Sequence, residues 1–254
     1  MTSVRHRALA VLLAVAPAAG LLMAAAPAQA APSTALPTVK SVSTSKTSFV
    51  LGSKAGCSKI TFTAVLSATM PSTDYLFSAV GVDLFAPGAS GDDSYDGTAL
   101  KQVGTSATYS GSLNFCGKYT AGNWRAEVYG AAVPSDADDE SDVQITNVVK
   151  VGISLKRPST LSFNASPEPV KKGKKLTAAG TLKVDGKVLS KATVQIYFKA
   201  TGAKTYSLKG STTTSSKGAF TKKFTATKSG TWKAVYAGSS TKNTVSAADA
   251  VKVK

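Results

Sequence analysis

The chain has 254 residues, and its 30 lysine and arginine side chains outnumber 14 aspartates and glutamates, which gives a net charge of +16. Its single histidine, His6, lies in a segment that is expected to be removed. A Ser-His-Asp triad, a Cys-His pair and histidine-based zinc sites are therefore excluded from the mature protein. A Ser-Lys dyad stays open as an alternative, although the sequence marks no particular pair. No cofactor is expected.

Residues 1–30 have the pattern of a secretory signal peptide. A basic start precedes an apolar run over residues 8–26, and an Ala-Gln-Ala site of small residues ends at Ala30. We expect cleavage after Ala30 and a secreted, extracellular protein without a membrane anchor. A retained anchor is the weaker alternative, because Pro17 and Gly20 interrupt the apolar run and no basic stop-transfer cluster follows it.

The first predicted domain covers residues 31–154 and contains the only two cysteines, Cys57 and Cys116. An exported chain with one pair of cysteines predicts a disulfide bond between them. The catalytic alternative, a thiol nucleophile, has no histidine to activate it. The bond should therefore stabilise the first domain, while the second domain relies on its core.

Acidic clusters of the first domain suggest a calcium site. The segment from Asp92 to Asp96 places oxygen ligands at the spacing of a calcium loop, but its twelfth position is Val103 instead of glutamate. A second cluster, residues 136–142, lacks the loop glycine. We interpret both clusters as solvated turns, with weak calcium binding by Asp92 and Asp96 as the alternative.

A pair of carboxylates is another way in which this chain could be an enzyme, since two carboxylates suffice to hydrolyse a glycoside. Asp83 and Glu127 are the candidates on predicted strands. Each alternates with apolar residues, as Glu127 does with Ala126 and Val128, so its side chain should point outward. We interpret both as surface charges and keep an extracellular hydrolase as the alternative function.

A five-residue pattern, Gly-x-Trp-basic-Ala, occurs at residues 122–126 and again at residues 230–234. The pattern uses both tryptophans of the chain, and it predicts two related domains in tandem. The joint falls at residues 154–159, where two basic residues and Pro158 interrupt the strand pattern. The second domain accordingly covers residues 155–254.

Apolar side chains of the second domain recur with a period of two, which predicts β-strands. The sets that should share a face are Leu176, Ala178, Gly180 and Leu182; Val194, Ile196 and Phe198; Tyr206 and Leu208; Phe220 and Phe224; and Trp232, Ala234 and Tyr236. Short strands separated by turn clusters are typical of a β-sandwich. We therefore predict an all-β protein of two tandem immunoglobulin-like β-sandwich domains.

Four segments of the second domain, residues 166–180, 193–198, 216–220 and 230–239, look like successive strands and turns of a known family. In them the chain resembles the bacterial immunoglobulin-like repeat domains of secreted proteins from high-GC Gram-positive bacteria. The resemblance covers the second domain well and the first only through its Trp motif. It implies an immunoglobulin-like architecture and an extracellular setting, and it implies no reaction.

The two predicted domains differ strongly in net charge. Residues 31–154 carry 8 basic and 11 acidic side chains, whereas residues 155–254 carry 20 basic and 3 acidic ones. A lysine-rich surface attracts anionic polymers such as teichoic acid, acidic polysaccharide or extracellular DNA. The candidate residues are Lys171, Lys172, Lys174, Lys175, Lys183, Lys199, Lys209, Lys223 and Lys233. The alternative is that the lysines only keep the sheets soluble and their edges unpaired.

Carbohydrate binding is a further alternative, because a β-sandwich can present an aromatic platform on one sheet face. Tyr197, flanked at alternate positions by Gln195 and Lys199, is the candidate for it. Trp124 and Trp232 begin apolar strands, so we interpret them as core residues. Together these observations predict a secreted, non-enzymatic interaction protein near the cell envelope or in the surrounding matrix.

Overall fold

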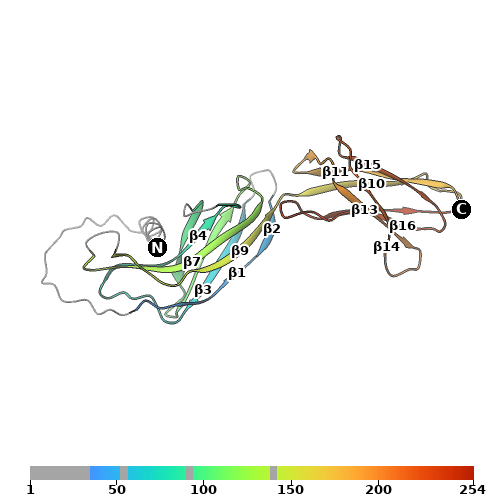
Figure 1. Cartoon of the computed structure of the whole chain (residues 1–254). Coiled ribbons are helices and arrows are strands. Elements are labelled where there is room, and N and C mark those ends of the chain that lie inside the picture. Colours follow the sequence, from blue (N-terminus) through green and yellow to red (C-terminus); the bar gives the residue numbers. More distant parts are fainter. Residues whose placement is uncertain (1–34, 52–56, 90–93, 138–141) are drawn as a thin grey trace. The chain divides into compact units, whose positions relative to one another are not determined.

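A computed structural model describes residues 35–51, 57–89, 94–137 and 142–254 (Figure 1). The predicted signal peptide lies outside these residues, as do Asp92 and most of the second acidic cluster. The described residues form β-strands joined by turns, so the all-β prediction is confirmed. The described part of the chain holds no helix that is long and apolar enough to span a membrane.

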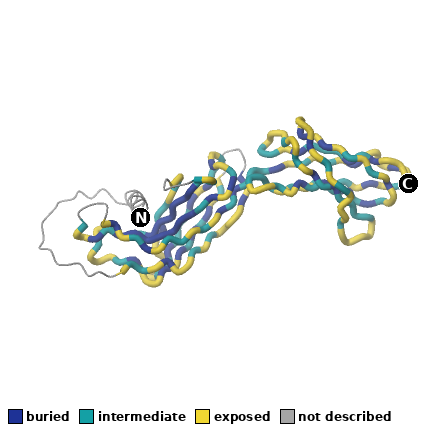
Figure 2. The backbone as a smooth tube through the Cα atoms, in the orientation of Figure 1, coloured by how far each residue is buried: buried dark blue, intermediate teal, exposed yellow. Residues whose placement is uncertain are grey.

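The described residues divide into two units. The first consists of residues 35–49 and 57–155, and the second of residues 156–254 with Val50 and Leu51. The central strands of the first unit contain long runs of buried residues, whereas buried and less buried residues alternate along the strands of the second (Figure 2). The central sheet of the first unit is therefore covered on both faces.

The described residues of the first unit form nine strands. They are β1 (Val39–Thr44), β2 (Ser48–Val50), β3 (Ser58–Leu66), β4 (Tyr75–Phe85), β5 (Asp96–Gln102), β6 (Thr108–Phe115), β7 (Gly122–Pro134), β8 (Gln144–Ile145) and β9 (Val149–Lys156). In hydrogen-bonding order, β1–β3–β6 face β5–β4–β7–β9, and the end of β5 also pairs with β6. The short strand β2 pairs with β9, and the short strand β8 pairs with β7. The two layers meet in the core, where the ring centroids of Phe115 and Trp124 lie 5.9 Å apart.

A disulfide bond joins Cys57 and Cys116, so the prediction of this bond is confirmed. Cys57 comes directly before β3 and Cys116 directly after β6, and the two strands are neighbours with Ser58 opposite Phe115. The Cα atoms of the cysteines lie 4.0 Å apart. The bond therefore ties two antiparallel strands together at one end of their sheet.

The described residues of the second unit form eight strands in two antiparallel sheets. They are β10 (Ser159–Ser166), β11 (Lys175–Val184), β12 (Lys187–Val188), β13 (Thr193–Ala200), β14 (Ser207–Thr213), β15 (Ala219–Thr225), β16 (Gly230–Tyr236) and β17 (Val245–Val251). One sheet has the order β10–β11–β15, with β12 beside the end of β11, and the other has the order β14–β13–β16–β17. Most of the predicted inward residues lie buried between them, including Leu176, Ala178, Leu182, Val194, Ile196, Trp232 and Ala234.

The two units share one strand order, because β1–β3–β6 facing β5–β4–β7–β9 corresponds to β10–β11–β15 facing β14–β13–β16–β17. Trp124 on β7 and Trp232 on β16 hold the same place in this order and are 2% and 5% exposed. The interpretation of both as core residues is confirmed. The motif glycine has a packing reason too, since a Cβ on Gly230 would lie 2.3 Å from the carbonyl oxygen of Lys199.

The expectation that Leu208 lies on a buried face is wrong, since its side chain is 53% exposed. The register of β13 and β14 shifts by one residue: Ile196 lies opposite Gly210, but Tyr197 lies opposite Leu208. Lys209 is the extra residue of this β-bulge. Because a bulge interrupts the period of two, side chains beyond it face the opposite side from the one that alternation predicts.

Candidate functional site

Three exposed lysines lie on the outer side of the β10–β11–β15 sheet. Lys175 and Lys183 project from β11 and Lys223 projects from β15. Thr160 of β10 lies opposite Lys183, and Thr177 of β11 lies opposite Lys223. The other outward residues of these three strands are Ser, Thr, Asn and Ala, with no carboxylate among them. We call Lys175, Lys183 and Lys223 the sheet lysines.

Three further candidate lysines, Lys171, Lys172 and Lys174, lie exposed in the turn that precedes β11. Gly173 permits this turn through its positive φ of 81°. A hydrogen bond of 3.0 Å from the backbone N of Lys174 to the carbonyl oxygen of Lys171 closes it. Because the turn leads directly into Lys175, a dense positive charge lies at this end of the sheet.

The carboxylates of the second unit offset little of this charge. Asp249 accepts a hydrogen bond from the backbone N of Ala165 at 2.8 Å, and Glu168 accepts one from the backbone N of Lys252 at 3.3 Å. The third carboxylate, Asp185, lies in the turn between β11 and β12. Two of the three acidic side chains are thus engaged with the backbone.

Lys199 and Lys233 do not join the sheet lysines. They lie on β13 and β16, on the outer side of the other sheet, and both are half-buried. Their ammonium nitrogens lie 5.2 and 5.3 Å from the ring centroid of Tyr206, which is a cation–π distance. The structure therefore divides the candidate lysines between the two sheets.

Tyr197, the candidate carbohydrate platform, lies on the same outer face as its register partner Lys233. Its side chain is half-buried, and its hydroxyl donates a hydrogen bond to Oε1 of Gln195 at 3.0 Å. Across β14 its neighbour is the exposed Leu208. A half-buried ring between a lysine and a leucine offers a sugar little stacking area.

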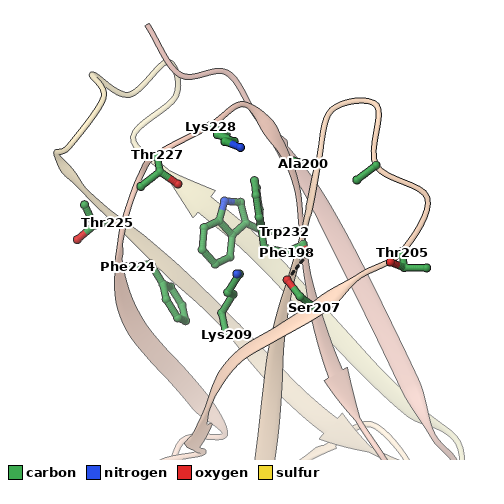
Figure 3. A pocket seen from close by; sticks show the side chains of 11 residues that line it. Phe198, Ala200, Thr205, Ser207, Lys209, Phe224, Thr225, Thr227, Lys228 and Trp232 are labelled. Carbon is green, nitrogen blue, oxygen red and sulfur yellow. Dashed lines mark hydrogen bonds between the residues drawn. The ribbon is translucent and has the colours of Figure 1, made fainter.

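The second unit holds a pocket of about 580 Å³ that the sequence pattern did not predict, beside the β13–β14 loop and the β15–β16 turn (Figure 3). Three aromatic residues line it, and the ring centroid of Trp232 lies 4.9 Å from that of Phe198 and 4.7 Å from that of Phe224. Lys209 and Lys228 also line it, and Figure 3 shows the ammonium group of Lys209 directed toward the indole. We call this cavity the Trp232 pocket.

In the first unit, two tyrosines cover the corresponding tryptophan. The ring centroids of Tyr95 and Tyr119 lie 5.1 and 5.2 Å from that of Trp124. The indole N–H of Trp124 donates to the carbonyl oxygen of Thr120 at 2.8 Å. Tyr119 belongs to the turn between β6 and β7, and Tyr95 directly precedes β5.

The second unit differs at both of these places. Its β15–β16 turn carries Lys228 and has no aromatic residue. Tyr206, which directly precedes β14, packs against Lys199 and Lys233 instead of against the tryptophan. The sequence signal for the Trp232 pocket was therefore the contrast between a turn that contains Tyr119 and a turn without an aromatic residue.

Of the two calcium candidates, the structure describes Asp96, and its carboxylate forms hydrogen bonds within the first unit. Its Oδ2 accepts a hydrogen bond from the hydroxyl of Tyr119, and its Oδ1 accepts one from the backbone N of Gly97 at 2.9 Å. Burial, together with the hydrogen bond to Asp96, raises the pKa of the Tyr119 hydroxyl well above its usual range. Across the described ranges, no three His, Cys, Asp or Glu side chains are grouped to hold a metal ion.

The interpretation of Asp83 and Glu127 as surface charges is wrong, because the residues are 1% and 6% exposed. They lie directly opposite each other on β4 and β7. Both point away from Trp124 as expected, but that side of the sheet carries a second apolar cluster, which includes Tyr129 and Val143. Ile145 and Val148 also pack against this cluster, so the face is apolar instead of solvated.

Both buried carboxylates have partners on this face. The hydroxyl of Tyr129 donates to Oδ2 of Asp83 at 2.8 Å. Glu127 forms ion pairs with Nε of Arg125 at 2.9 Å and with Nζ of Lys150 at 3.5 Å. These contacts give the two carboxylates a structural role inside the first unit.

Replacing Tyr129 by phenylalanine should destabilise the first unit by about 1–3 kcal/mol, because buried Asp83 loses a donor while ring packing is kept. Denaturant unfolding, followed by hydrogen exchange in β4 and β7, measures this change. Tyr75→Phe is the matched control: that hydroxyl donates to Gln144 at 3.2 Å in an exposed setting, so the variant should lose less than about 0.5 kcal/mol. Equal losses would contradict the special role of Tyr129.

No protein-family model matches the sequence, and no curated protein matches it. Among solved structures, the chain is similar to the three N-terminal domains of the outer capsid protein Hoc of bacteriophage RB49, with 12% identity, a TM-score of 0.34 and coverage of 86% of this chain and 70% of that one. It is also similar to fibronectin(III)-like modules of CbhA from Clostridium thermocellum, with 15% identity, a TM-score of 0.33 and coverage of 84% and 93%. A DUF4785 family protein from Legionella pneumophila has 13% identity, a TM-score of 0.38 and coverage of 83% and 56%.

Similarities at this level transfer no function to the chain. The class of the protein follows from its own strands, which form two tandem immunoglobulin-like β-sandwiches of one strand order.

Proposed function

We propose that this chain is a secreted, non-enzymatic interaction protein whose lysine-rich second unit associates electrostatically with anionic polymers of the cell envelope or the surrounding matrix. Teichoic acid, acidic polysaccharide and extracellular DNA are the polymers that suit this chemistry. The observation that carries the proposal is the outer face of the β10–β11–β15 sheet, where the sheet lysines are exposed without a neighbouring outward carboxylate.

Lysine suits such a role because its ammonium group is a hydrated point charge on a flexible stem. It can follow a mobile polymer without a fixed geometry. The other outward side chains of this face are small, so they leave a polymer free to approach the lysines. Pairing with polymer charges releases condensed counterions, so the affinity should depend steeply on salt.

The alternatives have less support. A carbohydrate platform at Tyr197 would rest on a single half-buried ring between Leu208 and Lys233. A glycoside hydrolase would need carboxylates that water and substrate reach, whereas Asp83 and Glu127 are buried with structural partners.

Binding of the mature chain to teichoic acid, polygalacturonate and DNA tests the proposal. The affinity should fall roughly 10²- to 10³-fold between about 50 and 200 mM salt. Changing the three sheet lysines to glutamine should weaken binding and lower the salt slope by about one per lysine.

The matched control changes three exposed lysines of the first unit, Lys40, Lys59 and Lys101, to glutamine. This variant has the same net charge as the sheet-lysine variant and should bind almost as the unmodified chain does. Absence of binding at low salt, or an affinity that salt leaves unchanged, would refute the proposed function.

A further inference from the structure

We propose that the Trp232 pocket binds one carboxylated sugar residue, of the hexuronic acid type, within an acidic polysaccharide. The inference rests on the proposed association with anionic polymers and specifies how one class of them is recognised. It assigns ring stacking to the aromatic residues of the pocket and carboxylate pairing to Lys209 and Lys228.

The aromatic lining suits a sugar ring. Phe198 and Phe224 are half-buried and supply most of the accessible aromatic area, whereas Trp232 is 5% exposed and supports them from the core at centroid distances of 4.9 and 4.7 Å. The C–H groups on one face of a sugar carry a slight positive charge and pack well on the negative face of an aromatic ring. The volume of about 580 Å³ lies in the usual range of small-molecule sites, about 300–1,000 Å³.

The charge of the pocket selects an anionic sugar. Lys209 and Lys228 are exposed at its rim, and none of its eleven lining residues is acidic. Figure 3 shows the ammonium group of Lys209 directed toward the indole and Lys228 above the ring in this view, so positive charge lies beside the aromatic lining. A carboxylate attached to a stacked ring can therefore form charge-assisted hydrogen bonds with these lysines.

Polar groups for the hydroxyls of a sugar are present as well. Within the described residues, the indole N–H of Trp232 has no hydrogen-bond partner, whereas that of Trp124 donates to Thr120. The side chains of Thr205 and Thr227 also line the pocket. Their hydroxyl groups can donate to a ligand or accept from it.

The β-bulge places Lys209 at this site. Without the extra residue, strict alternation along β14 would direct position 209 to the same side as Tyr197, away from the pocket. Bulges often re-aim a side chain next to a functional site. The bulge therefore brings Lys209 to the pocket, although the sheet could form without it.

The sandwich itself does not require an open pocket. The first unit has the same strand order, and there Tyr95 and Tyr119 occupy the place above the tryptophan. In the second unit Lys228 lies in the corresponding turn and Tyr206 packs elsewhere. The opening is thus specified by particular residues of the second unit.

The test uses a galacturonic acid trisaccharide, its neutral carboxyl-reduced counterpart and a short glycerol phosphate oligomer. The mature chain is titrated calorimetrically with each probe at about 150 mM salt, where diffuse surface attraction is screened. We expect binding of the acidic trisaccharide, at least tenfold weaker binding of the neutral one, and no stronger binding of the phosphate oligomer. Preference for the phosphate oligomer would overturn the sugar assignment.

Two variants test the residues. Lys209→Gln with Lys228→Gln should weaken trisaccharide binding at least tenfold, whereas Lys40→Gln with Lys59→Gln, an equal charge change at exposed positions of the first unit, should alter it less than twofold. Thr227→Tyr places an aromatic ring in the turn, as Tyr119 does in the first unit, and should block binding. Equal effects of the two lysine pairs would refute a role for the pocket.

Indole N–H signals in NMR spectra give an independent readout. The chain has two tryptophans, and the trisaccharide should shift the signal of Trp232 while leaving that of Trp124 in place. Salt-dependent polymer binding with no trisaccharide binding would refute this inference and leave the proposed function standing. Trisaccharide binding without any salt-dependent polymer binding would refute the proposed function and support the pocket.

Discussion

Replacing Trp124 by alanine should destabilise the first unit by about 3–5 kcal/mol. The side chain is 2% exposed and packs against the rings of Tyr95, Phe115 and Tyr119. Truncation leaves a cavity that these neighbours can fill only in part, and it removes the donor that satisfies the carbonyl oxygen of Thr120. The lost ring packing and the lost hydrogen bond both lower the free energy of unfolding.

Native-state hydrogen exchange of β7 measures this loss. The remaining fluorescence of the variant comes from Trp232 alone, so its denaturation midpoint reports the second unit. That midpoint should stay unchanged. A loss below about 1 kcal/mol would show that the aromatic cluster does not depend on its tryptophan.

Replacing Trp232 by alanine gives the matched comparison. Its ring is 5% exposed and also lies in the core, but it borders the pocket, so water can fill part of the space that truncation creates. The loss should therefore lie near about 3 kcal/mol, the lower end of the range for buried aromatic residues. A larger loss at Trp232 than at Trp124 would contradict the difference in packing.

Local signals were enough to predict the all-β fold and its disulfide. The period of two along β11, β13 and β16 follows from the alternation of side chains on a strand, and each case needs only a few neighbouring residues. The repeated motif predicted buried tryptophans for the same reason. The two cysteines left a single intramolecular pairing.

Non-local contacts explain the errors. Alternation gave the correct direction for Asp83 and Glu127, but the burial of their face depends on tertiary contacts, which the pattern of one strand does not show. The bulge at Lys209 depends on how β14 pairs with β13, and a single strand does not reveal that pairing. Charge counts likewise identified the basic unit without showing that Lys199 and Lys233 pack on Tyr206.

The Trp232 pocket lies between the features that local sequence predicts and those that only the structure shows. Its residues were visible in the sequence, yet each one has an ordinary structural explanation when it is considered alone. Only the comparison of the two units shows that the β15–β16 turn, which holds Thr227 and Lys228, lacks the aromatic cover that Tyr119 provides in the first unit. A repeat is therefore most informative where its copies differ at one structural position.

Removing the Cys57–Cys116 disulfide should destabilise the first unit by up to about 4 kcal/mol. The cysteines are separated by 59 residues, so the bond greatly restricts the unfolded chain. Cys57 is exposed and Cys116 is half-buried, so replacing both by alanine loses little packing and mainly removes the cross-link. The second unit has no cysteine and should keep its stability.

Two measurements separate the cross-link from other effects of the substitution. The free energy of unfolding of the Cys57→Ala, Cys116→Ala variant should match that of the unmodified chain after reduction of its disulfide, because both lack only the bond. Fluorescence of Trp124 should report the lower stability of the first unit, and hydrogen exchange in β16 should report an unchanged second unit. If reduction lowers the stability of both units equally, or of neither, then the bond does not stabilise the first unit in the way its position implies.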